Sequence, residues 1–214
     1  MADFPYYGTY ARFDTLEKKD GAILMNADSI VGDRYEIEIA RENGARRAWL
    51  KNRFGARVGF FDEATTHELS LCEAKGWTLV GILSFAAFSE MPEPGVYWGQ
   101  AAIIAYDELH ADVVEPFIER VRALIGQGVR PQVSLGPGAL EQLQAAPDSW
   151  MPTERVDLPA REKGTVILKS RQKVSEKLIE QGRQKNIGCY IVSWLFLLGV
   201  VALLVFGLKS CGLF

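Results

Sequence analysis

The chain has 214 residues, of which 48% are hydrophobic and 24% are charged, a composition typical of globular proteins rather than disordered or collagen-like ones. Its formal net charge of −3 argues against a chain built mainly to neutralise nucleic acid phosphates. The length is enough for one domain with an appendage.

We expect residues 1–27 to form an N-terminal segment that precedes the β-rich region. The first residues, Met1 to Phe4, have neither the basic region nor the apolar region of a cleavable signal peptide. We therefore expect no cleaved leader.

The strongest local pattern predicts a β-hairpin over residues 35–53. Hydrophobic and charged residues alternate on both sides of Asn43-Gly44, and this dipeptide favours a two-residue turn because both of its positions need a positive φ. The turn implies a register in which apolar residues on one face lie opposite each other and, on the other face, opposite charges lie opposite each other. The expected pairs are Ile39 with Ala48, Ile37 with Leu50, Glu38 with Trp49, and Glu36 with Lys51.

The elements expected after the hairpin alternate between strands and helices. They are a strand over 56–61, a helix over 63–75 capped by Asp62, strands over 77–88 and 96–106, a helix over 112–125, a short strand over 132–135, a helix over 139–145, a strand over 164–168 and a basic helix over 170–185. This order favours an α+β fold, a small antiparallel, partly open β-barrel with packed helices. We place the barrel in 28–106 and a helical, mixed extension packed on it in 107–160.

Several motifs in the barrel region carry a family resemblance. They are Ser29-Ile30-Val31-Gly32, Arg57-Val58-Gly59-Phe60-Phe61, a following helix with Ala64 and Leu69, and Gly76 before the next strand. In these features residues 28–88 resemble a HIRAN domain, a small barrel that stands alone in bacteria and is attached to fork-remodelling helicases. The resemblance implies single-stranded nucleic acid binding and a bacterial source. The family's long Asn- and Pro-containing loop is replaced here by Asn52-Arg53-Phe54-Gly55, which puts the implied binding in doubt.

A basic stretch of the hairpin is the candidate binding site. Its residues are Arg46, Arg47, Trp49, Lys51, Arg53 and Arg57. Strand parity places Arg47, Trp49, Lys51 and Arg53 on one face, where cations beside an aromatic ring suit a single-stranded nucleic acid or anionic lipid head groups. The alternative is a solvated outer face on which Lys51 pairs with Glu36.

No catalytic residue, cofactor site or metal site is predicted. The two histidines, His67 and His110, have no partners at metal-ligand spacing, and no glycine turn has the residues of a phosphate-binding loop. The sequence therefore favours a binding or scaffolding module over an enzyme. A hydrolase with an unmarked site is a further alternative.

The C-terminal region predicts a membrane anchor. Residues 187–208 are 22 residues without a charge, and a helix of that length spans about 33 Å, enough to cross a bilayer. Residues 161–186 carry eight basic and three acidic residues, whereas 209–214 form a short tail with one lysine. The positive-inside rule then places the N-terminal domain in the cytoplasm, tethered to the plasma membrane by a single-pass tail anchor.

The basic juxtamembrane segment, 161–186, is expected to contact anionic lipid. The predicted contacts are Lys169, Arg171, Lys173, Lys177, Arg183 and Lys185. Cys189, at the start of the apolar run, is either an acylation site or a small buried hydrophobe. The expected partners are the lipid bilayer and a protein that the sequence does not identify, with nucleic acid as the alternative.

Overall fold

The computed structural model describes residues 4–16, 18–26, 29–42, 44–91, 93–160, 163–173 and 196. The chain divides into a compact unit, Met1–Gln172, and a second unit, Lys173–Phe214. The predicted membrane span, 187–208, lies outside the described residues apart from Phe196. Within the described part of the chain, no helix is both long and apolar enough to cross a membrane.

The first unit contains seven strands and four α-helices among its described residues. In chain order they are β1 (Tyr6–Asp14), α1 (Lys18–Met25), β2 (Arg34–Glu42), β3 (Ala45–Lys51), β4 (Arg57–Phe61), α2 (Glu63–Ala74), β5 (Thr78–Ser89), β6 (Val96–Tyr106), α3 (Ala111–Gly126), α4 (Pro137–Ala145) and β7 (Thr165–Lys169). A short 3₁₀ turn, Glu108–His110, precedes α3.

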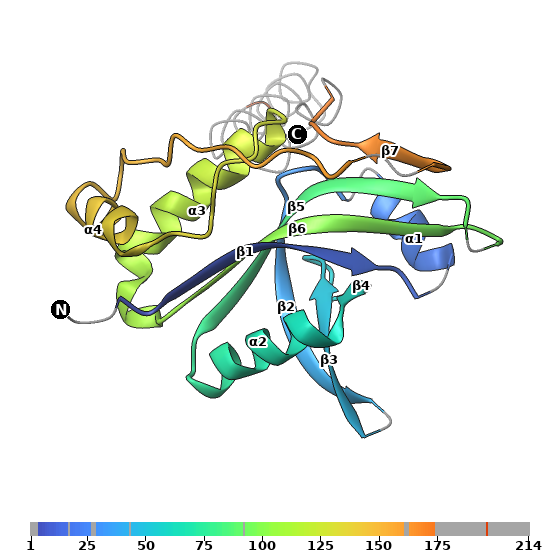
Figure 1. Ribbon diagram of the computed structural model, residues 1–214, viewed down its shortest axis with the longest axis horizontal. Helices are drawn as coiled ribbons and strands as arrows, with labels where there is room; N and C mark the ends of the chain where they lie inside the picture. The colour runs from blue at the N-terminus through green and yellow to red at the C-terminus, as the bar shows by residue number, and fades with distance from the viewer. Residues whose placement is uncertain are drawn as a thin grey trace, which may run out of the picture. The chain divides into compact units, whose positions relative to one another are not determined.

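Six of the strands form a closed antiparallel β-barrel (Figure 1). The order around it is β2-β3-β4-β1-β6-β5, and pairing of β2 with β5 closes the ring. The seventh strand, β7, pairs with the second half of β5, beyond the segment of β5 that pairs with β2. The fold is therefore α+β, as predicted, but the barrel is closed rather than partly open.

The barrel interior is filled by hydrophobic side chains. Phe13 of β1 is fully buried, and its ring lies against Gly59 and Gly99 on the neighbouring strands, where a Cβ atom would approach it to 2.5 and 2.6 Å. Leu24 of α1 and Leu69 of α2 complete the same core. Interiors pack to the density of organic crystals, so these two glycines make room for the phenylalanine ring.

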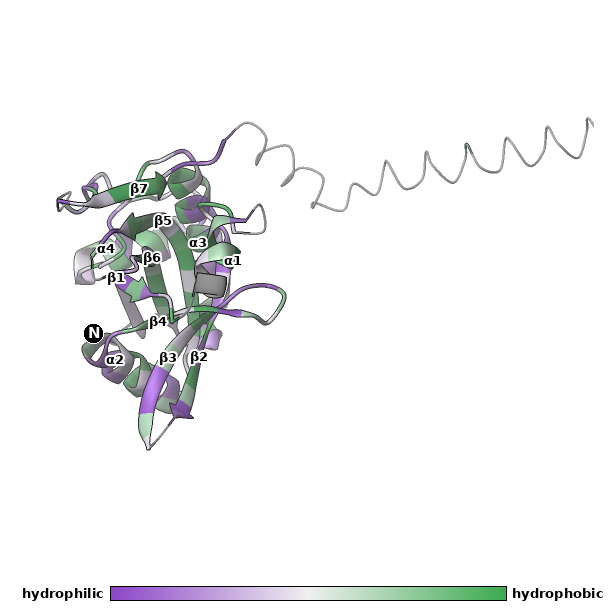
Figure 2. Cartoon of the chain, turned by 90° about the vertical axis from the view of Figure 1, so that its right-hand side faces the viewer, coloured by the Kyte–Doolittle hydropathy of each residue, from purple (hydrophilic) through white to green (hydrophobic). Residues whose placement is uncertain are grey.

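A second core lies outside the barrel, between α3 and the strands β5 and β6. Helix α3 places Val114, Phe117 and Val121 at helical spacing against Ile82 and Ile104. Because β6 contributes to both cores, it is apolar on both faces, as predicted for a strand buried on both sides. Figure 2 shows the hydrophobic residues along β5 and β6, whereas hydrophilic residues occupy the free end of the β2–β3 hairpin.

The predicted hairpin is confirmed. Strands β2 and β3 pair in the expected register, with Ile37 opposite Leu50 and Glu38 opposite Trp49, and Gly44 has a φ of +83°. Helix α2 begins after Asp62, whose side chain accepts a hydrogen bond from the Thr65 amide, as expected for an N-cap.

Other expectations differ from the structure. The N-terminal segment 1–27 supplies β1 and α1, and β1 is the strand that joins β4 to β6. The predicted strand over 132–135 is absent, and only an isolated bridge between Pro131 and Arg155 is found nearby. The strand expected over 164–168 is β7, which belongs to the first unit rather than to a separate juxtamembrane segment. Residues 170–173, where a basic helix was expected to begin, are not helical.

The first unit has two distinct poles. Figures 1 and 2 both place β7 at one pole and the free end of the β2–β3 hairpin at the other. The chain leaves the unit at the β7 pole, where the Gln172 amide donates a hydrogen bond to the Gly126 carbonyl at the end of α3.

Candidate functional site

The predicted basic site lies on the outer face of β2, β3 and β4, which we call the β2–β4 cluster. Its residues are Glu36, Glu38 and Glu42 of β2, Arg47, Trp49 and Lys51 of β3, and Arg57 and Phe60 of β4. In β2 and β3 they share one face because alternate residues of a strand point to the same side. In β4, Phe60 lies opposite Trp49, and a register shift next to Leu50 places Arg57 opposite Lys51.

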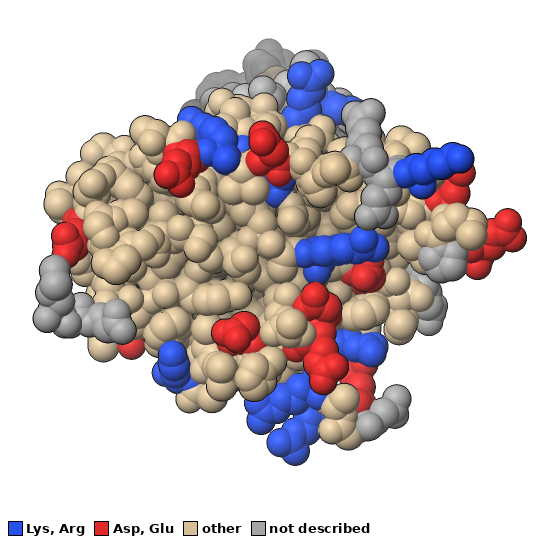
Figure 3. Space-filling model, in the orientation of Figure 1, with Lys and Arg blue, Asp and Glu red and all other residues tan. Residues whose placement is uncertain are grey.

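The cations of the β2–β4 cluster are paired with its carboxylates. Arg57 bonds Glu42 at 2.8 Å and Glu38 at 3.2 Å, and Lys51 lies 3.5 Å from Glu36. Arg47 lies 3.7 Å from Glu42. The hydrogen bond from Arg57 holds the pKa of Glu38 below its usual value. Three acids thus balance three bases, and Figure 3 shows basic and acidic side chains side by side over the part of the domain where the hairpin and α2 lie.

Trp49 is buried within the β2–β4 cluster. Only 4% of its surface is exposed, and its ring lies 5.5 Å from that of Phe60. The guanidinium carbon of Arg57 is 5.0 Å from the ring centre, and that of Arg47 is 5.7 Å from it. Cation–π contacts of this kind stabilise a packed surface. The burial of the ring leaves little surface on which a nucleotide base would stack.

The remaining predicted hairpin residues do not join the β2–β4 cluster. Arg53 lies in the turn after β3, with its guanidinium 4.6 Å from the centre of the exposed Phe54 ring. Arg46 is exposed on the opposite face of β3 from Trp49. The structure therefore assembles Arg47, Trp49, Lys51 and Arg57 and leaves Arg46 and Arg53 outside. The whole hairpin end lies at the pole opposite to the chain's exit (Figure 1).

Lys169 is not a surface residue, so its predicted role as a lipid contact is wrong. Its side chain is 8% exposed, and its Nζ atom donates hydrogen bonds to the carbonyl oxygens of Leu24, Asn26 and Ser29 at 2.7 to 3.3 Å. These bonds tie β7 to the end of α1. An ammonium group buried among carbonyl oxygens cannot also reach a lipid head group.

Two of the other predicted lipid contacts, Arg171 and Lys173, are exposed beyond the end of β7. The rest of the set, Lys177, Arg183 and Lys185, lies outside the described residues, as does Cys189.

Two grooves flank α2 where β1 and β3 diverge. The larger, of about 1030 Å³, lies between α2 and the hairpin and is lined by Arg46, Phe60 and Glu63 among others. The smaller, of about 460 Å³, lies between α2 and β1, and its walls include Thr9 and Glu68. Both are lined by Asp62, Ala64 and His67, so α2 is the shared wall. The sequence analysis did not identify either groove, because each depends on where β4 ends relative to β1.

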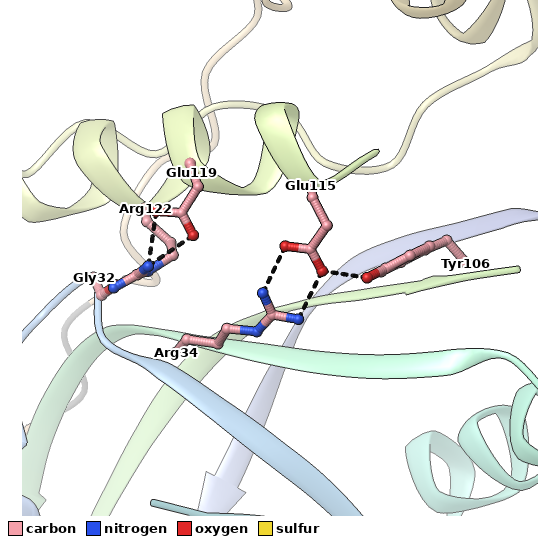
Figure 4. A network of polar contacts seen from close by, with 6 residues as sticks. All are labelled: Gly32, Arg34, Tyr106, Glu115, Glu119 and Arg122. Carbon is pink, nitrogen blue, oxygen red and sulfur yellow. Dashed lines mark hydrogen bonds and ion pairs between the residues drawn. The ribbon is translucent and has the colours of Figure 1, made fainter. Parts of the chain in front are cut away.

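A partly buried polar network links β2, β6 and α3 (Figure 4). Arg34 makes two hydrogen bonds to the carboxylate of Glu115, at 2.6 and 2.8 Å, and the Tyr106 hydroxyl donates to the same carboxylate. The hydrogen bonds from Arg34 lower the pKa of Glu115, whereas burial raises the pKa of Tyr106 to about 12. Two turns further along α3, Arg122 bonds both Glu119 and the Gly32 carbonyl. The network clamps α3 to the barrel.

In the part of the chain that the structure describes, no group of three His, Cys, Asp or Glu side chains could hold a metal ion. Cys72 is buried on α2, and burial raises the pKa of its thiol.

Comparison of the chain with models of protein families, with curated proteins and with solved structures found no match. The resemblance to a HIRAN domain therefore stays a prediction.

Proposed function

We propose that this protein is a single-pass, tail-anchored membrane protein whose α+β domain is a cytoplasmic binding or scaffolding module for another protein. The proposal has two parts, the anchor and the binding surface, and each is supported by separate observations.

The anchor is supported by the sequence. The uncharged run 187–208 is long enough for a transmembrane helix, and the basic residues before it favour the cytoplasmic side. The exposed Arg171 and Lys173 lie between the end of β7 and that run, where they can meet anionic head groups.

The pair of grooves along α2 is the observation that carries the binding role. The barrel interior is filled by side chains such as Phe13, Leu50 and Phe61, so a partner is recognised on the surface. The grooves provide concave surfaces with both apolar and charged walls, which suits contact with a polypeptide. They lie beside the hairpin, away from the β7 pole through which the domain is tethered, and this leaves them accessible to a cytoplasmic partner (Figure 1).

Fractionation of cells that express the full chain tests the anchor. We expect the protein to pellet with membranes, to resist extraction by alkaline carbonate and to dissolve in nonionic detergent. Protein that stays in the high-speed supernatant without detergent would refute the anchor.

Site-specific photo-crosslinking in intact membranes tests the binding surface. A photoreactive residue in place of His67, which lines both grooves, should give a discrete cross-linked band. The same residue in place of Glu141, exposed on α4 and outside both grooves, is the matched control. Equal labelling from the two positions would show that the grooves are not the contact surface.

A further inference from the structure

The β1 strand has an unpaired edge. On one side β1 pairs with β6 along its whole length, from Tyr6 to Asp14. On the other side it pairs with β4 at two residues only, Phe13 and Asp14. Among the described residues, no strand pairs with positions 6–12 on that side. An edge of this length presents main-chain donors and acceptors to any strand that can approach it.

The pairing with β6 identifies the main-chain groups at this edge. In an antiparallel pair, the N–H and C=O of one residue point to the same side, and successive residues alternate. The Thr15 amide donates to Tyr97, and the Pro5 carbonyl accepts from Asp107, so the odd-numbered residues of β1 bond towards β6. The main-chain groups of Gly8, Tyr10 and Arg12 therefore point away from β6, towards α2.

The edge stays open because β4 ends early. Asp62 follows β4 directly and caps α2, accepting a hydrogen bond from the Thr65 amide at 2.7 Å. The chain turns into a helix at the point where a longer β4 would have continued along β1. The smaller groove, lined by Thr9, Tyr10 and Arg12 on one wall and by α2 on the other, occupies that position.

The helix wall of the groove is acidic. Asp62 and Glu68 line it, and neither forms an ion pair with another described residue. The cation on the strand wall, Arg12, is already paired with Asp14 at 2.9 Å. The groove therefore complements positive charge.

We propose that an extended peptide with basic side chains binds in this groove by adding a strand to the free edge of β1. Main-chain hydrogen bonds to Gly8, Tyr10 and Arg12 supply the affinity, and lysine or arginine side chains on the face that meets α2 supply the specificity. The inference rests on the proposed binding role and specifies its ligand class, a basic segment of a partner protein.

Fluorescence anisotropy with synthetic peptides tests the main-chain contacts. The probe is a fluorescein-labelled nine-residue peptide of alternating lysine and valine, titrated with the full chain in nonionic detergent. Two further peptides carry N-methyl groups on all lysines or on all valines. Only one of these two sets faces β1 in an added strand, so we expect one methylated peptide to lose binding about tenfold or more and the other to retain it. Equal loss or equal retention would overturn strand addition.

Two matched substitutions on α2 test the charge contacts. Glu68→Lys reverses a charge in the groove, whereas Glu73→Lys reverses an exposed charge on the same helix outside it. We expect Glu68→Lys to weaken peptide binding about fivefold and Glu73→Lys to leave it within twofold. A peptide with glutamate in place of lysine should not bind. Equal effects of the two substitutions would overturn the assigned groove.

Hydrogen exchange read at single residues locates the contact. In the free chain the amides of Gly8, Tyr10 and Arg12 should exchange faster than those of Thr9 and Ala11, and the lysine–valine peptide should protect them. Slow exchange of the three amides before the peptide is added would show that the edge is already covered, for example by a second copy, and would overturn the proposal. The outcome is separate from the test of the anchor, since a chain that fails to pellet with membranes can still be titrated with the peptide.

Discussion

The ammonium group of Lys169 lies 2.7 Å from the carbonyl oxygen of Asn26, a residue 143 positions earlier in the chain. With its further bonds to Leu24 and Ser29, it holds β7 against the end of α1. The contact fixes the last strand of the folded unit just before the chain leaves it. Tension on the segment that follows therefore acts on a strand that is held both by its pairing with β5 and by this side chain.

Replacing Lys169 with methionine should destabilise the domain. The substitution keeps much of the side-chain volume but removes the donor to three carbonyl groups, two of which belong to the buried residues Leu24 and Ser29, at a cost of about 1 to 3 kcal/mol. Urea unfolding of the full chain in nonionic detergent, followed by tryptophan fluorescence, measures the change. Lys163→Met, at an exposed position six residues earlier, should change the stability by less than about 0.5 kcal/mol. Equal stability of the two variants would contradict the role of Lys169.

The glycines around Phe13 should not tolerate a methyl group. At Gly59 a Cβ atom would lie 2.5 Å from the Phe13 ring and 2.9 Å from the Asp14 carbonyl oxygen, so Gly59→Ala should cost about 1 to 3 kcal/mol. Combining it with Phe13→Leu should recover part of that loss, because the smaller side chain relieves one of the two contacts. The control is Gly138→Ala on α4, where a Cβ atom would meet nothing within 4 Å. The same urea titration compares the variants, and additive losses in the double variant would contradict the packing described.

The pair formed by Arg34 and Glu115 should stabilise the domain in a pH-dependent way. Because Arg34 lowers the pKa of Glu115 in the folded state, the stabilisation is fully present above the ordinary glutamate value of 4.5 and is lost as the pH falls through the lower, folded-state value. Both side chains are about one-third exposed, so we expect a coupling of about 1 kcal/mol at pH 7. A double-mutant cycle of Arg34→Met and Glu115→Gln, repeated at several pH values, measures it. A coupling that stays constant down to the acid unfolding limit would exclude this explanation.

Trp49 should not act as a stacking platform for nucleic acid. Its ring is 4% exposed and lies beside the guanidinium groups of Arg47 and Arg57, which are themselves paired with glutamates. We expect a labelled oligothymidylate of about 20 nucleotides to bind no tighter than micromolar at physiological salt, and Trp49→Phe to leave that binding unchanged. Phe54→Ala, which removes the exposed aromatic ring beside Arg53, is the control substitution. Submicromolar binding that only Trp49→Phe weakens would restore the nucleic acid hypothesis.

Local patterns predicted the parts of the fold that depend on neighbouring residues. The Asn43-Gly44 turn determined the hairpin register, and Asp62 determined the start of α2. Strand β1 was not predicted because its two faces differ little in hydropathy: tyrosines and small residues, such as Tyr6, Tyr7 and Gly8, occupy both. The closure of the barrel depends on this strand and was therefore missed.

The candidate site was only partly predictable for a similar reason. The alternation of side chains along a strand placed Arg47, Trp49 and Lys51 on one face. It could not show that Trp49 is buried or that Arg57 pairs with two glutamates. Lys169 lies among basic residues that the positive-inside rule explains, and nothing in its local sequence indicates that three carbonyl groups from 140 or more residues earlier surround it. These contacts depend on how distant segments meet.

The position of β1 also affects how the protein is made. Its main partner, β6, is completed only at Tyr106, so after Asp14 leaves the ribosome the first strand waits roughly 5 to 20 seconds at ordinary rates of synthesis before its neighbour exists. During that interval the nascent chain carries an aromatic-rich segment that lacks its main partner strand. Molecular chaperones that bind emerging polypeptides would meet that segment first, well before the apolar C-terminal run is synthesised.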